Sequence, residues 1–145
     1  MRALLRLALL AALLGMPCRG AGIASVEFHL VVDCKAGAQA MPVRGSEKAF
    51  CLSPDVILGT GDIIAAKRTD RGGFHDVVEI KSSPPAATRM QEATRANVGG
   101  RIGVLYNGEL VSAIRILDPI RSDGTWITGL KRAEADDLVT RLNRR

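Results

Sequence analysis

Alternating hydrophobic and polar positions after residue 25 predict a series of short strands. These strands are expected at residues 26–33, 48–52, 75–81, 101–106, 110–116 and 125–128. Three further segments are predicted to be helices, the first from a start at Thr60 or Asp62 and the other two from apolar residues at helical spacing. They are residues 62–67, a segment that starts near Ser83 and Pro84, and a closing segment around Ala135, Leu138 and Leu142.

Glycine and asparagine residues predict where these elements turn or end. Asn107 and Gly108 separate two apolar stretches and supply the positive φ angles of a tight hairpin turn. Gly99 and Gly100 are expected to cap the second helix, because glycine adopts the left-handed conformation without steric cost. Gly129 is expected to form the turn that follows the strand at 125–128.

The order of these elements predicts the fold class. Strands joined by hairpins, with helices between them that each have one apolar face, favour an α+β two-layer sandwich. We expect a mostly antiparallel sheet with a β-hairpin and two or three helices on one face. No repeat or linker divides residues 25–145, so they are predicted to form one domain.

Residues 1–24 have the three parts of a secretory signal peptide. A basic start is followed by ten apolar residues at 7–16 and then by small residues up to position 24. The apolar run is shorter than the roughly 20 residues that a membrane-spanning helix needs. The sequence therefore predicts cleavage and a periplasmic or secreted protein without a membrane span. Lipidation at Cys18 is the alternative, although Pro17 stands where a small residue is expected.

Removal of the signal leaves two cysteines, Cys34 and Cys51. An even number of cysteines in an oxidising compartment favours a disulfide, which for a loop of this length stabilises by about 3 kcal/mol. Two free buried thiols, or half of a metal site, are the alternatives. A metal site is the least favoured, because there is no Cys-x-x-Cys pair and the two histidines are far apart in sequence.

Composition and charge argue against nucleic-acid binding. Only five aromatic residues occur, too few for the stacking platforms of single-strand binders. The net charge is +5, but three of the 20 basic residues lie in the predicted signal, which leaves 17 against 15 acids. Much of the basic character therefore belongs to the export signal.

Catalytic chemistry finds little support in the sequence. Ser112, His75 and Asp76 are the only conceivable triad, and no nucleophile elbow or oxyanion signature accompanies them. Gly99 and Gly100 follow a helix and precede a strand, the reverse of the order that presents backbone amides to a phosphate. We predict a protein that is not an enzyme and needs no cofactor.

Residues 94–142 carry an ordered set of motifs. They read T-x-x-N-x-G-G-R-I-G-V-L-Y-N-G-E-L-V-S-A, then D-P-I, G-T-W-I-T-G and E-A-x-D-L-V-T-R-L. This segment resembles the head of the first periplasmic domain of SecD, an accessory subunit of the bacterial Sec translocon. The resemblance extends more loosely to residue 50. Ile114 departs from it where the family usually has proline, as do Ser122 and Asp123 where a glycine-rich turn is common.

The resemblance implies contact with exported polypeptide. In the family, SecD works with SecF in the inner membrane, and the head is thought to catch emerging preproteins. Only this head property could apply to a chain without membrane helices. We expect binding by strand addition at an edge strand, either 26–33 or 125–128. Apolar contacts are expected from Val111, Ala113 and Trp126, unless these side chains simply fill the core.

The predicted partners are thus unfolded polypeptide or an envelope protein, with Sec translocon components as one form of the latter. The alternative is a structural or interaction protein that uses the same fold to bind an unrelated folded partner. The residues do not predict the oligomeric state.

Overall fold

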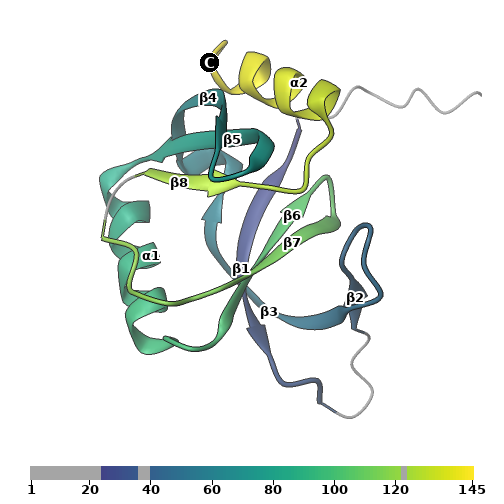
Figure 1. The fold of residues 1–145 in the computed structure, drawn as a ribbon. Helices are drawn as coiled ribbons and strands as arrows, with labels where there is room; N and C mark the ends of the chain where they lie inside the picture. Colours follow the sequence, from purple (N-terminus) through teal and green to yellow (C-terminus); the bar gives the residue numbers. More distant parts are fainter. Residues whose placement is uncertain (1–23, 36–39, 122–123) are drawn as a thin grey trace, which may run out of the picture.

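The computed structural model describes residues 24–35, 40–121 and 124–145. The predicted signal at residues 1–24 lies outside this part except for Ala24. Within it, two sheets and two α-helices form the molecule (Figure 1). The strands are β1 (Val26–Val32), β2 (Met41–Pro42), β3 (Ala49–Gly59), β4 (Ile63–Arg71), β5 (Phe74–Ser82), β6 (Arg101–Tyr106), β7 (Glu109–Arg115) and β8 (Gly124–Ile127). The helices are α1 (Pro84–Ala96) and α2 (Arg132–Leu142).

The larger sheet has the strand order β2-β3-β1-β6-β7, and its strands pair antiparallel. Strand β1 lies at its centre, between β3 and β6. The prediction that residues 26–33 form an edge strand is therefore wrong. The central position follows from pairing on both edges, with β3 and with β6, and its side chains Val26 and Phe28 are almost completely buried.

The smaller sheet has the order β4-β5-β8, again antiparallel. The helix predicted at residues 62–67 is wrong, because this segment begins β4 after a single 3₁₀ turn at Thr60–Asp62. A bulge near Ile64 shifts the register with β5 and places Ile63 and Ala66 on the same buried side. This three-residue spacing imitates a helix, although a β-bulge produces it.

Strand β3 is longer than the strand predicted at residues 48–52. It continues through Pro54, a residue that cannot donate a ladder hydrogen bond. The register with β1 shifts between His29 and Val31, which face Val56 and Leu52. The irregularity absorbs the extra residues around Pro54 and lets the strand continue to Gly59.

The hairpin predicted around Asn107 and Gly108 is confirmed. Both residues have positive φ, 50° and 80°, and they join β6 to β7. Each strand is within one residue of its predicted bounds. The strand predicted at 125–128 is likewise confirmed as β8, and it ends the smaller sheet in the described part of the chain.

Helix α1 begins at Pro84 and stops before Gly99, which has a φ of 88°. Gly100 has no positive φ, so Gly99 alone uses the conformational freedom of glycine at this helix end. The closing helix α2 buries Ala135, Leu138 and Leu142 as its spacing predicts.

The two helices do not share one face as predicted. Helix α1 packs on β3 of the larger sheet, whereas α2 packs on β4 and β5 of the smaller one (Figure 1). The α+β class and the mostly antiparallel pairing are confirmed, but a single sheet with one helical layer is not. One continuous core joins both sheets and both helices, with Phe28, Ile80, Met90 and Leu138 among its most buried side chains.

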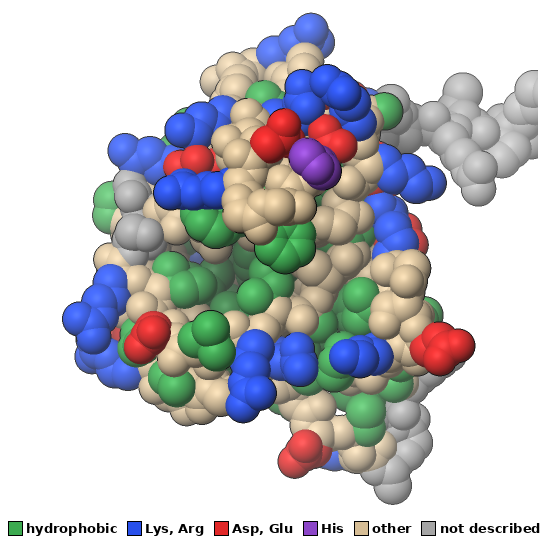
Figure 2. All heavy atoms as spheres, viewed as in Figure 1, with side chains coloured by type: hydrophobic (Ala, Val, Ile, Leu, Met, Phe, Trp, Pro, Cys, Tyr) green, Lys and Arg blue, Asp and Glu red, His purple; other side chains and the backbone are tan. Residues whose placement is uncertain are grey.

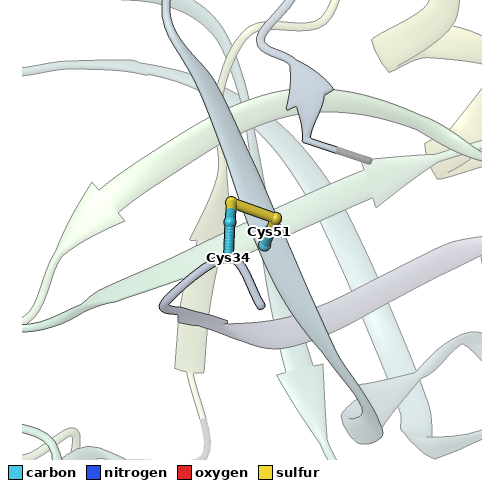
Figure 3. Close-up of a disulfide and its surroundings, with 2 residues drawn as sticks. All are labelled: Cys34 and Cys51. Atoms are coloured by element: carbon cyan, nitrogen blue, oxygen red, sulfur yellow. A yellow bond between two sulfur atoms is a disulfide. The ribbon is translucent and has the colours of Figure 1, made fainter. Parts of the chain in front are cut away.

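The disulfide predicted from the cysteine count is present. Cys34 follows β1 and Cys51 lies on β3, with their Cα atoms 5.2 Å apart (Figure 3). The bond links the end of β1 to the neighbouring strand, where Val32 faces Cys51 in the ladder. It thus closes the connection that carries β2.

Candidate functional site

An apolar hollow lies where the edge strand β7 of the larger sheet approaches the edge strand β8 of the smaller one. Its volume is about 340 Å³, at the lower end of the range for ligand sites. Figure 2 shows this hollow with hydrophobic side chains on its walls. The lining residues are Phe28, Ile102, Ile114, Arg115, Ile116, Leu117, Asp118, Ile120, Gly124, Thr125 and Trp126.

The floor and the rim of the hollow differ in burial. Phe28 and Ile116 form the floor and are 2% and 4% exposed, so they belong to the core of the fold. At the rim, Ile114 and Trp126 are each 42% exposed, and Leu117 is 74% exposed. Three large apolar side chains thus face solvent around one concave surface, the kind of patch that marks interaction sites.

Hydrogen bonds to α1 and to Gly99 and Gly100, which follow it, hold one wall of the hollow in place. Ile116 N–H donates to the Gly100 carbonyl at 2.9 Å, and Gly99 N–H donates to the Ile116 carbonyl at 2.8 Å. Further along, Ile120 N–H donates to the buried hydroxyl of Thr94 at 2.9 Å. The segment after β7 is therefore fixed to the end of α1, although it has no regular secondary structure of its own.

Two arginines flank the hollow. Arg115 lines it, and the guanidinium of Arg71 lies 4.7 Å from the centre of the Trp126 ring, a cation–π contact. Asp118 is the single acidic residue among the described lining residues. In the described part of the chain, neither arginine forms an ion pair.

The three residues predicted to contact polypeptide lie in different environments. Trp126 is on the rim of the hollow, as an apolar contact requires. Val111 is only 3% exposed and fills the core, which was the alternative expectation for each of them. Ala113 is half-buried on β7 and does not line the hollow.

Gly129 holds the turn after β8 against β7. Its φ is 83°, and a Cβ atom at this position would lie 2.2 Å from the carbonyl oxygen of Val111. Only glycine combines a positive φ with the absence of a Cβ atom, so the geometry agrees with the structural turn expected from the sequence.

A network of charges ties the start of α2 to the β2–β3 turn. Arg44 donates hydrogen bonds to Glu109 on β7 and to Glu134 on α2, the latter at 2.7 Å. The Arg44 hydrogen bond lowers the pKa of Glu109. Partial burial acts to raise the pKa of Glu134, but hydrogen bonds from the Lys131 N–H and from Arg44 outweigh it and lower that pKa.

The conceivable triad is not assembled. His75 is exposed near the β4–β5 turn, with its Nδ1 3.8 Å from Asp70. The hydroxyl of Ser112 is buried in the other sheet and has no hydrogen-bond partner among the described residues. Within residues 24–35, 40–121 and 124–145, no group of three or more histidine, cysteine or acidic residues could hold a metal ion.

Sequence reasoning missed most of the hollow. In the sequence, Ile114 stands out only as a departure from the family pattern, and Leu117 belongs to no predicted element. The available signal is at residues 114–117, where Ile114 and Ile116 alternate with Arg115 and the adjacent Leu117 interrupts the alternation of a strand. Phe28 and Ile102, which also line the hollow, come from β1 and β6, so no local pattern connects them to this segment.

The fold and the hollow define a small α+β domain with an apolar surface site between two sheet edges. Among the described residues, no helix has both the length and the apolar character to cross a membrane. Residues 38–144 match the model of the SecDF P1 head subdomain, and the chain belongs to this family. This is a family of protein-translocation accessory domains and not a known enzyme family.

Two curated relatives are named protein translocase subunit SecD. The protein from Acidaminococcus fermentans is 29% identical over 89 residues, which cover 61% of this chain and 21% of that protein. The protein from Thermobaculum terrenum is 32% identical over 85 residues, covering 57% of this chain and 16% of that protein. The chain thus spans about a fifth of the length of the curated relatives it matches.

Solved SecDF structures share the fold. A structure of SecDF, described as a membrane component that enhances protein export, superimposes with a TM-score of 0.64 at 21% identity, covering 83% of this chain and 62% of that chain. A crystal structure of SecDF in a super-membrane-facing form gives a TM-score of 0.66 at 23% identity, covering 83% of this chain and 18% of that chain.

Proposed function

We propose that residues 25–145 form an exported, non-enzymatic binding domain that holds extended or unfolded polypeptide in the hollow between β7 and β8. The observation that carries this proposal is the ring of exposed apolar side chains, Ile114, Leu117 and Trp126, around a concave apolar floor. Such a surface stabilises apolar side chains of a chain that has not yet buried them. Membership of the head family supports the same role, since its relatives are translocase subunits.

Two features make an extended chain a suitable ligand. Strand β8 ends its sheet in the described part of the molecule, so a peptide could add to it by backbone hydrogen bonds. The hollow beside β8 would then accept one or two apolar side chains of the same peptide. Backbone pairing gives little sequence preference, which suits a domain that meets many exported proteins.

Residues 1–24 are proposed to direct the chain out of the cytoplasm and to be removed. The domain would then act in the periplasm or outside the cell, with Sec translocon components or another envelope protein as further partners. The Cys34–Cys51 disulfide supports an oxidising compartment.

Titration of a labelled, permanently unfolded polypeptide, followed by fluorescence anisotropy, tests the proposal. Saturable binding at or below tens of micromolar is expected, and Leu117→Asp should weaken it at least about tenfold because a charge replaces an apolar contact. The matched control is Ile64→Asp, at a similarly exposed position on β4, which does not line the hollow. Equal loss in both variants, or no saturable binding, would refute the proposed site.

The alternative function is binding of one folded partner through the same fold. The same polypeptide in its folded and unfolded forms distinguishes the two functions. Preference for the unfolded form supports the proposal, whereas equal binding of the folded form favours the alternative.

A further inference from the structure

We infer that the hollow selects polypeptide segments in which an apolar side chain is flanked by aspartate or glutamate side chains. This inference rests on the proposed function and adds a preference for ligand sequence to it. The geometry behind it is an apolar hollow of about 340 Å³ with a positively charged border, formed by Arg115 on its wall and Arg71 stacked over Trp126.

Both cations are available to a ligand. Four other arginines among the described residues have carboxylate partners, namely Arg44, Arg68, Arg89 and Arg141. Arg68, for example, lies 2.9 Å from Asp76 and 2.7 Å from Asp136. In the described part of the chain, neither Arg115 nor Arg71 forms an ion pair, and the Arg71 guanidinium lies over the Trp126 ring. An approaching carboxylate therefore competes with no existing ion pair.

Arg115 pairs with a second arginine, Arg101, which does not line the hollow and whose guanidinium lies 5.5 Å from the centre of the Phe50 ring. Arg101 faces Arg115 across the β6–β7 ladder, and Arg101 is itself held by a hydrogen bond to the Ala113 carbonyl at 3.3 Å. Like charges directly opposite each other on a sheet are unfavourable, and a bound carboxylate relieves that repulsion. Asp118 alone opposes this charge among the described lining residues.

The two parts of the site would act together on one segment. The apolar side chain enters the hollow between Ile114, Leu117 and Trp126, and a neighbouring carboxylate reaches the border arginines. A segment flanked by lysines would place cations against the same border. The preference is thus a charge complementarity around an apolar anchor.

Trp126 provides the readout, because it is the only tryptophan of the chain and lies on the rim. The probes are three peptides of equal length without tryptophan or tyrosine, acetylated and amidated so that their ends carry no charge. They share a central leucine that is flanked by aspartates, asparagines or lysines. Trp126 fluorescence is titrated with each peptide at low and at high salt.

The aspartate peptide should bind about threefold to tenfold more tightly than the asparagine peptide, as expected for one or two exposed ion pairs. The lysine peptide should bind more weakly than both. Added salt should remove most of the difference, because exposed charges are screened. Arg115→Gln and Arg71→Gln should each reduce the preference for the aspartate peptide over the asparagine peptide.

Arg132→Gln is the matched control, an exposed arginine on α2 that does not line the hollow, and it should leave the preference unchanged. Equal binding of the three peptides, or a preference that survives both arginine substitutions, would overturn the inference and leave the proposed function intact. Absence of binding by all three peptides, together with absence of binding by the unfolded polypeptide, would overturn both. Dimerisation of the protein that Leu117→Asp abolishes would also overturn the inference, since a second copy would then occupy the hollow.

Discussion

Loss of the Cys34–Cys51 disulfide is expected to lower the free energy of unfolding by about 3 kcal/mol. The two cysteines are 17 residues apart, and the loop-entropy relation for a closure of this length gives this magnitude at 25 °C. The bond acts on the unfolded chain, because in the folded protein the ladder between β1 and β3 already holds these residues together. With a urea dependence of about 1–3 kcal/mol per molar, the midpoint should fall by about 1–3 M.

Urea unfolding of the oxidised protein, the reduced protein and the Cys34→Ala/Cys51→Ala variant measures this effect. The reduced protein and the double variant should unfold at similar midpoints, and reductant should not change the midpoint of the variant. Equal midpoints for the oxidised and reduced proteins would refute the reasoning. Such a result would mean that the unfolded chain keeps the two strands together without the bond.

Three further predictions concern a turn, a charge network and the hollow. Gly129→Ala should destabilise the fold by at least about 2 kcal/mol, because Gly129 has a positive φ and its backbone lies against β7. Gly61→Ala is the control and should cost less than about 1 kcal/mol, because a Cβ there would lie in open space. Equal urea midpoints for the two variants would contradict this prediction. Arg44 and its two carboxylate partners, Glu109 and Glu134, should stabilise the fold above pH about 4.5, and this contribution should disappear as the pH falls through the lowered pKa values of the two carboxyls. Arg44→Gln should therefore make the free energy of unfolding depend less on pH in this range. Parallel curves of unfolding free energy against pH for the variant and the unsubstituted protein would contradict this prediction. Ile116→Ala should cost about 2–4 kcal/mol of stability and Ile114→Ala less than about 1 kcal/mol, and similar losses in the two variants would show that floor and rim are not distinct.

Local chemistry made part of the fold predictable. Asn107 and Gly108 determine the hairpin, because few other residue pairs accept two positive φ angles in succession. Pro84 and Gly99 likewise mark the limits of α1 through backbone restrictions that do not depend on the rest of the molecule. Where one residue type fixes the backbone, the sequence predicts the element within one or two positions.

Other parts depend on contacts between distant segments. The bulge near Ile64 gives β4 an apolar spacing of three, which no local rule distinguishes from a helical turn. The central position of β1 follows from its pairing with both β3 and β6, whereas its sequence would suit an edge strand equally well. Of the candidate contact residues, Trp126 lies on the surface, and the hollow beside it combines β1, β6, β7 and β8.

The floor and the rim of the hollow differ in burial, and this difference favours a binding site over a packing defect. The floor residue Phe28 is buried by the same contacts that stabilise the sheets, so the fold itself determines the shape of the hollow. The rim is different, because Ile114, Leu117 and Trp126 keep large exposed areas that contribute little to folding. Polar residues at these three positions would serve the stability and solubility of an isolated domain better. The proposed function accounts for their apolar character, because a bound polypeptide would cover them, and the inferred preference for acidic segments rests on the arginines beside them, Arg71 and Arg115.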